Sequence, residues 1–127
     1  MKLLTIILLF LPIIASAKEI IRNKVLEVHC NYPEYALQDG IHKSKESFDL
    51  NFMIDVGNKK TFFKGNNGIS EVTLVLTDDG TGFSFIEIAP NGSVMTTAID
   101  KNMKSVHSRN SIIGGVLYPQ QYYGTCK

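Results

Sequence analysis

The chain contains only two cysteines, Cys30 and Cys126, and no C-x-x-C pair. A dithiol redox motif is therefore excluded, and a zinc site would need more nearby ligands than Cys30 and His29 provide. The three histidines, His29, His42 and His107, are spread along the chain without the spacing of metal ligands. The sequence therefore predicts no metal site and no bound cofactor.

Familiar catalytic motifs are also missing, namely G-x-S-x-G, H-E-x-x-H and a phosphate-binding glycine loop. His107 precedes Ser108, but neighbouring side chains of a strand point to opposite faces and do not form a base–nucleophile pair. Asp49 and Asp55 share a strand face but lie about 20 Å apart, too far to act together. We therefore expect a protein that is not an enzyme, and a hydrolase using His107 with a distant carboxylate is the less favoured alternative.

Long apolar runs are absent except for one at the start, Leu3–Ile14. Lys2 precedes this run, and the small-x-small pattern of residues 15–17 (Ala-Ser-Ala) follows it, which is typical of a signal peptide. The run is shorter than the ~20 residues that a membrane-spanning helix needs. We predict that residues 1–17 are cleaved and that residues 18–127 form one domain without a transmembrane segment, either periplasmic or extracellular.

An excess of charge of one sign is absent from this predicted domain. Of the 13 lysines and arginines one, Lys2, lies in the signal peptide, whereas all 12 acidic residues follow it, so the remaining charges balance. A neutral domain lacks the basic surface with which proteins bind nucleic acid or anionic lipid. These two classes of partner are therefore not expected.

In the rest of the chain, apolar and polar residues alternate, which is the two-residue period of a β-strand. Asn91-Gly92 between two such runs is a strong hairpin signature. The triplet Asn91-Gly92-Ser93 also matches a glycosylation acceptor, which the same turn explains equally well. A single helical turn is expected between Tyr32 and Asp39. The alternating runs are residues 26–30, 48–55, 71–77, 83–88, 94–99, 104–111 and 116–118.

About seven short strands joined by short turns predict an all-β fold, a single antiparallel meander that closes into a barrel or a two-sheet sandwich. In an oxidising compartment the two cysteines predict one disulfide, Cys30–Cys126. Such a bridge encloses almost the whole domain, which is worth on the order of 4–5 kcal/mol in the loop-entropy model. It would tie the first strand to the C-terminal segment.

The last thirty residues carry three short motifs: Thr-Thr-Ala-Ile at 96–99, Ser-Arg-Asn-Ser at 108–111 and Pro-Gln-Gln-Tyr-Tyr-Gly-Thr-Cys at 119–126. This pattern resembles that of small exported bacterial proteins of uncharacterised function, which carry T-T-x-I, S-R-x-[ST] and P-x-Q-Y-x-G-x-C. The pattern has His after the arginine, where this chain has Asn110. The resemblance implies export and no particular activity.

Arg109 is the only arginine besides Arg22, and its planar guanidinium offers a two-pronged donor that lysine lacks. It either clamps a carboxylate or backbone carbonyls in the fold, or binds an anionic ligand or partner. Tyr118, Tyr122 and Tyr123 either cap the open end of a barrel or form a binding surface, in which tyrosine is enriched. With His107, these residues are the candidate binding site.

We expect an exported domain that binds a protein or an envelope component. Inhibition of a wall-degrading enzyme is a specific form, because small periplasmic lysozyme inhibitors share this size, export route and β-barrel class. Their S-G-x-x-Y loop is not found here. The alternative is a carrier of a small apolar ligand inside a barrel, suggested by phenylalanine-rich strands, although small barrels are commonly filled by their own side chains.

Overall fold

The computed structural model describes residues 24–65 and 68–127, and the predicted signal peptide, residues 1–17, lies outside them. The described residues form nine strands and no helix, which confirms the all-β fold class. They accordingly include no helix with the length and hydropathy that a membrane crossing requires. The strands are β1 (Val25–Leu37), β2 (Gly40–Lys43), β3 (Asp49–Asp55), β4 (Lys60–Gly65), β5 (Gly68–Leu76), β6 (Phe83–Ile88), β7 (Val94–Ile99), β8 (Lys104–Ile113) and β9 (Val116–Cys126).

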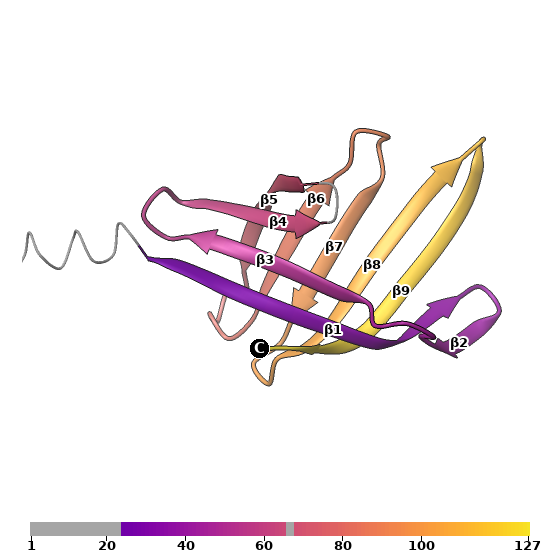
Figure 1. Cartoon of the computed structure of the whole chain (residues 1–127), viewed down its shortest axis with the longest axis horizontal. Helices are drawn as coiled ribbons and strands as arrows, with labels where there is room; N and C mark the ends of the chain where they lie inside the picture. Colours follow the sequence, from indigo (N-terminus) through magenta and orange to yellow (C-terminus); the bar gives the residue numbers. More distant parts are fainter. Residues whose placement is uncertain (1–23, 66–67) are drawn as a thin grey trace, which may run out of the picture.

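Eight of these strands close into an antiparallel barrel. Strands β3 to β9 pair in chain order, while β1 pairs with β3 on one edge and with β9 on the other (Figure 1). Strand β2 is an additional strand that pairs with the end of β1. Of the two arrangements that the sequence left open, the barrel is therefore the one formed.

The predicted disulfide is confirmed and lies where the barrel closes. Cys30 on β1 and Cys126 on β9 are direct partners in the strand register and are joined by the disulfide. The bridge links residues 96 positions apart, so it fastens the first strand to the last.

Apolar side chains pack together at one end of the barrel. The turns β3–β4, β5–β6 and β7–β8 lie at one end, where Ile54, Leu74, Phe83, Ile99 and Met103 pack together. The hairpins β4–β5, β6–β7 and β8–β9 lie at the other end, which we call the mouth. The polar interior residues described below lie on the mouth side of this apolar plug.

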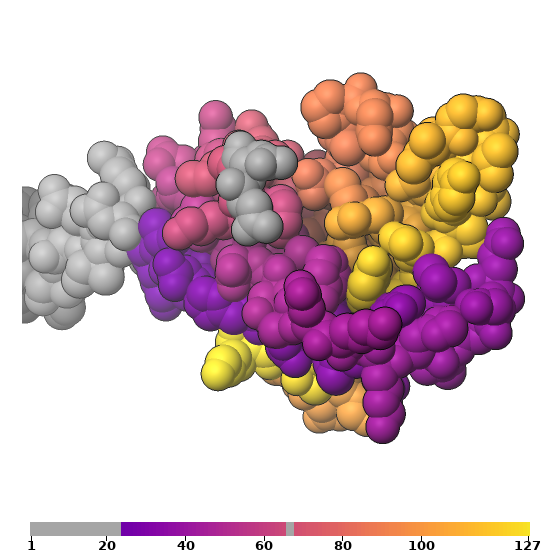
Figure 2. Space-filling view, turned by 45° about the vertical axis from the view of Figure 1, so that its right-hand side comes forward, coloured from indigo at the N-terminus to yellow at the C-terminus, as the bar shows by residue number. Residues whose placement is uncertain are grey.

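The β8–β9 hairpin projects beyond the barrel at the mouth. Figure 2 shows its tip in yellow beside the orange tip of the β6–β7 hairpin. The strands run two residues further than the predicted 104–111, because Gly114 and Gly115 both have positive φ, 58° and 79°, and make a two-residue turn that matches the strand twist. The second strand likewise continues from 116 to 126 rather than ending at 118.

The predicted helical turn between Tyr32 and Asp39 is wrong, because β1 continues to Leu37. Residues Glu34, Tyr35 and Ala36 pair with β2 on one edge and with β9 on the other. Tyr32 is fully buried, and its hydroxyl lies 2.8 Å from Ser105 Oγ. Pairing on both edges and burial of this ring outweigh the local preference for a turn.

Candidate functional site

The inner faces of β6, β7 and β8 place polar side chains inside the barrel. Alternate residues of a strand share a face, and the β7–β8 register sets Thr97 opposite His107 and Met95 opposite Arg109. The β6–β7 register adds Glu87 opposite Met95. Three neighbouring strands therefore bring Glu87, Thr97, His107 and Arg109 to one part of the barrel wall.

His107 is a buried imidazole with one of its two nitrogens engaged. Its Nδ1 lies 2.8 Å from Thr97 Oγ1, whereas its Nε2 is buried without a hydrogen-bond partner among the described residues. The ring centres of Tyr32 and Tyr122 lie 6.1 and 5.9 Å away. Burial, and secondarily the positive charge of Arg109, lower the pKa of His107 to about 4. The imidazole is therefore neutral at pH 7.

Arg109 also carries an unpaired donor inside the barrel. Its Nε is buried and has no hydrogen-bond partner in the described part of the chain. Burial raises the pKa of the nearby Glu87, and the charge of Arg109 opposes that rise only in part. Glu87 and Arg109 thus feel each other's charge, yet the ion pairs found between described residues are those of His29 and His42, and Arg109 takes part in neither.

A cavity of about 70 Å³ lies against these groups. Its wall combines aromatic rings with the polar side chains of Glu87, Thr97, His107 and Arg109. The rings of Phe52 and Phe85 stack in this wall, with their ring centres 4.0 Å apart. The residues that define its character are Phe52, Phe63, Phe85, Thr97, His107 and Arg109. The cavity is therefore apolar on one side and carries unpaired nitrogens on the other.

A wider hollow of about 810 Å³ at the mouth adjoins this cavity. Glu87, Arg109 and Phe63 line both spaces, so they stand at the junction between them. The outer rim is formed where β3 begins and β4 ends, by residues such as Asp49 and Lys64. A molecule that entered from the mouth would meet Glu87 and Arg109 before it reached His107.

The structure brings together part of the predicted site. His107 and Arg109 line the cavity, and Tyr122 packs beside it, with its ring centre 4.3 Å from that of Phe48. Its hydroxyl donates to Gln120 Oε1 at 3.3 Å.

The other two predicted tyrosines lie elsewhere. Tyr118 is on the same face of β9 as Tyr122 but in the projecting hairpin, where 49 % of it is exposed. Tyr123 lies on the opposite, outer face of β9, and its hydroxyl donates to Gln121 Oε1 at 2.8 Å.

Glu87 and Thr97 are site residues that the sequence reasoning missed. Alternation alone places Glu87 on the face of β6 that also carries Phe85, and Thr97 on the face of β7 that carries Ile99. A polar residue on an otherwise apolar strand face was the signal that could have singled them out. Their position beside His107 depends on the strand registers, which no local pattern contains.

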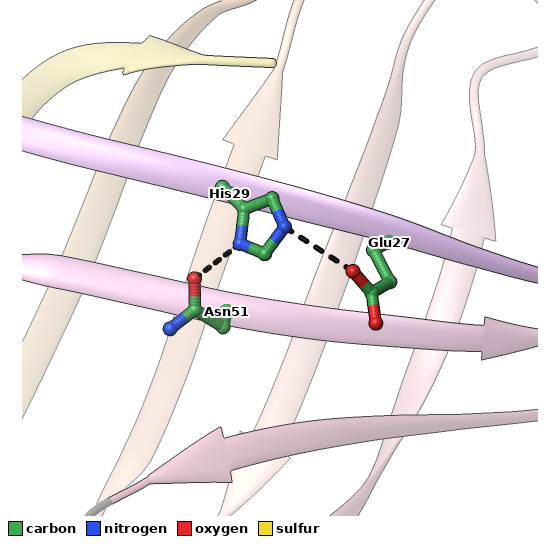
Figure 3. A network of polar contacts seen from close by, with 3 residues as sticks. All are labelled: Glu27, His29 and Asn51. Carbon is green, nitrogen blue, oxygen red and sulfur yellow. Dashed lines mark hydrogen bonds and ion pairs between the residues drawn. The ribbon is translucent and has the colours of Figure 1, made fainter.

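A second polar network lies on the outer face of β1 and β3 (Figure 3). The imidazole of His29 lies between Asn51, with Nδ1 2.5 Å from Oδ1, and Glu27, with Nε2 3.4 Å from Oε2. All three side chains are exposed or half-exposed. The network holds the histidine ring in one orientation on the sheet surface, where His29 and Asn51 border a shallow hollow with Ser47 and Asp49.

Neither of these two networks of described residues forms a metal site. Among residues 24–65 and 68–127, no three histidine, cysteine or acidic side chains converge in a way that could hold an ion. Inside the barrel, His107, Glu87, Thr97 and Arg109 offer one neutral imidazole, one carboxyl, one hydroxyl and one guanidinium. These groups are suited to hydrogen bonding with a small polar or charged group.

Comparison with known proteins gives no match to this chain, whether with protein-family models, with curated proteins or with solved structures. The resemblance of the C-terminal motifs to small exported bacterial proteins stays a prediction.

Proposed function

We propose that the protein is an exported, non-enzymatic binding protein whose barrel takes up a small ligand through the mouth. The observation that carries this proposal is the pair of buried nitrogens, His107 Nε2 and Arg109 Nε, that border one cavity without partners. Buried polar atoms in folded proteins are nearly always hydrogen-bonded, and a bound water or ligand is a common explanation for an exception. A partly aromatic cavity with a few polar groups is also the usual character of a ligand site.

Export is part of the proposal. The signal-like segment at residues 1–17 supports it, and so does the Cys30–Cys126 disulfide, since such bonds persist mainly in oxidising compartments. A barrel fastened by a disulfide keeps its shape outside the cell, where a carrier or receptor has to hold its ligand.

The competing occupant of the cavity is water. A buried water needs about 10–15 Å³ of such space, so a 70 Å³ cavity has room for several waters that could satisfy both nitrogens. Occupation by water alone would leave the barrel without a binding role. The two cases differ in mass, because only a ligand survives purification as a defined adduct.

Native mass spectrometry of the full chain, expressed and exported by a bacterial host, tests the proposal. We expect a protein species that carries a noncovalent adduct, lost on denaturation and depleted in Arg109→Gln. Tyr123→Phe, which removes a hydroxyl from the outer face, is the matched control and should retain the adduct. Bare protein in every preparation, with no small molecule bound on later addition, would contradict the proposal.

Turnover is measured in the same preparation, because His107 is also the residue on which a hydrolase would depend. Ester hydrolysis by the wild type that disappears in His107→Ala would replace the binding proposal with the enzymatic one. Unchanged, background-level hydrolysis in both proteins is the expected result.

A second candidate function, binding of a protein or envelope component, is favoured by the β8–β9 hairpin. Its tip exposes apolar side chains on both faces, with Ile112 70 %, Ile113 62 %, Val116 54 % and Leu117 53 % exposed. Large exposed apolar patches commonly mark interaction sites. Inhibition of a wall-degrading enzyme is one form that such binding could take.

One double variant distinguishes the two candidate functions. Ile112→Ser/Leu117→Ser should abolish capture of a partner from envelope extracts while it leaves a barrel ligand in place. If the double variant captures the same partner as the wild type, the hairpin has no role in binding.

A further inference from the structure

We infer that the ligand of the barrel is a monocarboxylate with a short unbranched chain, whose carboxylate lies between Arg109 and His107 and whose chain extends toward the mouth. The inference rests on the proposed function, and it names the class of molecule that the same site would take.

The first step is the sign of the ligand's charge. The guanidinium of Arg109 is a permanent cation with donors only, and its Nε–H is buried without an acceptor. The strongest partner for such a group is an anionic oxygen, and a carboxylate matches the planar fork of the guanidinium with two parallel hydrogen bonds. A neutral acceptor would satisfy the Nε–H with a weaker hydrogen bond, and a cationic ligand would be repelled by the guanidinium.

The second step concerns His107, which offers another hydrogen-bond donor beside that of Arg109. The hydroxyl of Thr97 can donate to Nδ1 of the neutral His107, and the proton of the ring then lies on Nε2, the atom without a partner. His107 and Arg109 line the same cavity. A carboxylate there accepts from Nε2–H of His107 with one oxygen and from the guanidinium with the other.

The third step is the role of Glu87, the acidic side chain that borders the cavity. As a carboxylate it competes with the ligand for Arg109 and repels it, whereas as a carboxylic acid it can donate to the ligand's oxygen. Burial raises its pKa, and the charge of Arg109 opposes that rise. The other titratable side chains that face His107 are Tyr32, whose pKa burial raises, and Tyr122.

The fourth step is size. A dry cavity of about 150 Å³ accommodates benzene, and the inner cavity here is about half as large. It therefore admits a carboxylate head and one or two carbons, but no aromatic ring. The rest of the chain has to lie in the hollow at the mouth, along Phe63 and Ile69.

The test is a calorimetric titration of the exported full chain at pH 7 with three probes of equal length: octanoate, 1-octanol and octylamine. We expect octanoate to bind at least about tenfold more tightly than octanol, and octylammonium not to bind. Shortening the acid should weaken binding by up to about fourfold for each methylene that loses contact with Phe63 or Ile69.

Variants test the assigned residues. Arg109→Gln should weaken octanoate binding at least about tenfold, Arg109→Lys should weaken it less, and Glu87→Gln should strengthen it. Lys60→Gln, on the strand β4 and outside the cavity lining, is the matched control and should change nothing. Should Arg109→Gln fail to fold, the ¹⁵N shift of His107 Nε2 in the wild type still reports on octanoate.

The outcomes separate the two proposals. Equal affinity for octanol and octanoate, or no effect of Arg109→Gln, would overturn the carboxylate assignment and leave a barrel ligand of another class. No binding of any probe, no shift at His107 and no adduct in the purified protein would overturn both.

Discussion

At the scale of single residues, His107 makes the stability of the folded protein depend on pH. Only 3 % of it is exposed, and the neighbouring guanidinium of Arg109 adds to the cost of a second positive charge. The folded protein therefore resists protonation of this ring, whereas the unfolded chain protonates it near the ordinary pKa of 6.5. The difference in proton uptake is a contribution to stability that depends on pH.

We predict that the free energy of unfolding falls as pH is lowered from about 6.5 to 4, because the unfolded state takes up a proton that the folded state does not. The contribution is complete above the unfolded pKa and amounts to on the order of 3 kcal/mol, given about 1.4 kcal/mol for each pKa unit. Urea denaturation at a series of pH values measures it. His107→Gln should be less stable at pH 7 and show a flatter slope in this window.

The control for this prediction is Tyr123→Phe, on the outer face of β9, where the hydroxyl contacts Gln121, and it should keep the wild-type slope. Glu87 acts in the opposite sense, because its raised pKa means that protonation favours the folded state. The difference between wild type and His107→Gln cancels this contribution to first order. Equal slopes in the two proteins would show that His107 does not titrate as described.

At the scale of elements, the contact between β1 and β9 depends on a glycine. The register of this pair shifts between Asn31 and Glu34, and β9 crosses the irregular stretch at Gly124. A Cβ on Gly124 would overlap the backbone oxygen of Asn31 and lie 2.8 Å from the Cα of Tyr32. Close approach of two backbones, rather than a turn, is the reason for glycine here.

We predict that Gly124→Ala destabilises the protein by at least about 2 kcal/mol, because neither backbone can move without breaking the pairing that closes the barrel. Thermal denaturation followed by circular dichroism measures the loss. Gly65→Ala is the comparison, since its new methyl group would meet the ring of Phe63, a side chain that can turn away. A Gly124→Ala protein as stable as Gly65→Ala would mean that β1 and β9 can separate at no cost.

At the scale of the whole molecule, closure of the barrel brings the first strand of the described chain beside the last. The Cys30–Cys126 bridge spans 96 positions, so the reduced unfolded chain has far more freedom than the bridged one. A closed barrel also leaves few open strand edges, which protects it from pairing with other chains. The disulfide therefore acts mainly on the unfolded state, and the sheet supplies the shape.

We predict that Cys30→Ala/Cys126→Ala loses about 4 to 5 kcal/mol of unfolding free energy, the value of the loop-entropy model for a loop of this length. Guanidinium denaturation of the oxidised protein, the reduced protein and the double variant measures it. The last two should coincide. A loss below about 1 kcal/mol would show that β1 and β9 stay close together in the unfolded chain even without the bridge, so that the disulfide removes little of its freedom.

The sequence by itself determined the features that depend on neighbouring residues. Alternation predicted most of the strands. The Asn91-Gly92 turn was placed correctly, and two cysteines allowed only one intramolecular disulfide. Such patterns are local, since the side-chain direction in a strand repeats every two residues whatever the strand pairs with.

Only the tertiary structure decided which strands meet and in what register. The strands form a barrel and not a sandwich, and β1 continues through the residues expected to form a helical turn. Tyr122 lies inside the barrel, whereas Tyr123 lies outside it. The tertiary structure also brought Glu87 and Thr97, ten residues apart in the chain, beside His107 and Arg109. Register is set by hydrogen bonds between distant segments and by closure of the whole sheet, and neither is written in the period of any one strand.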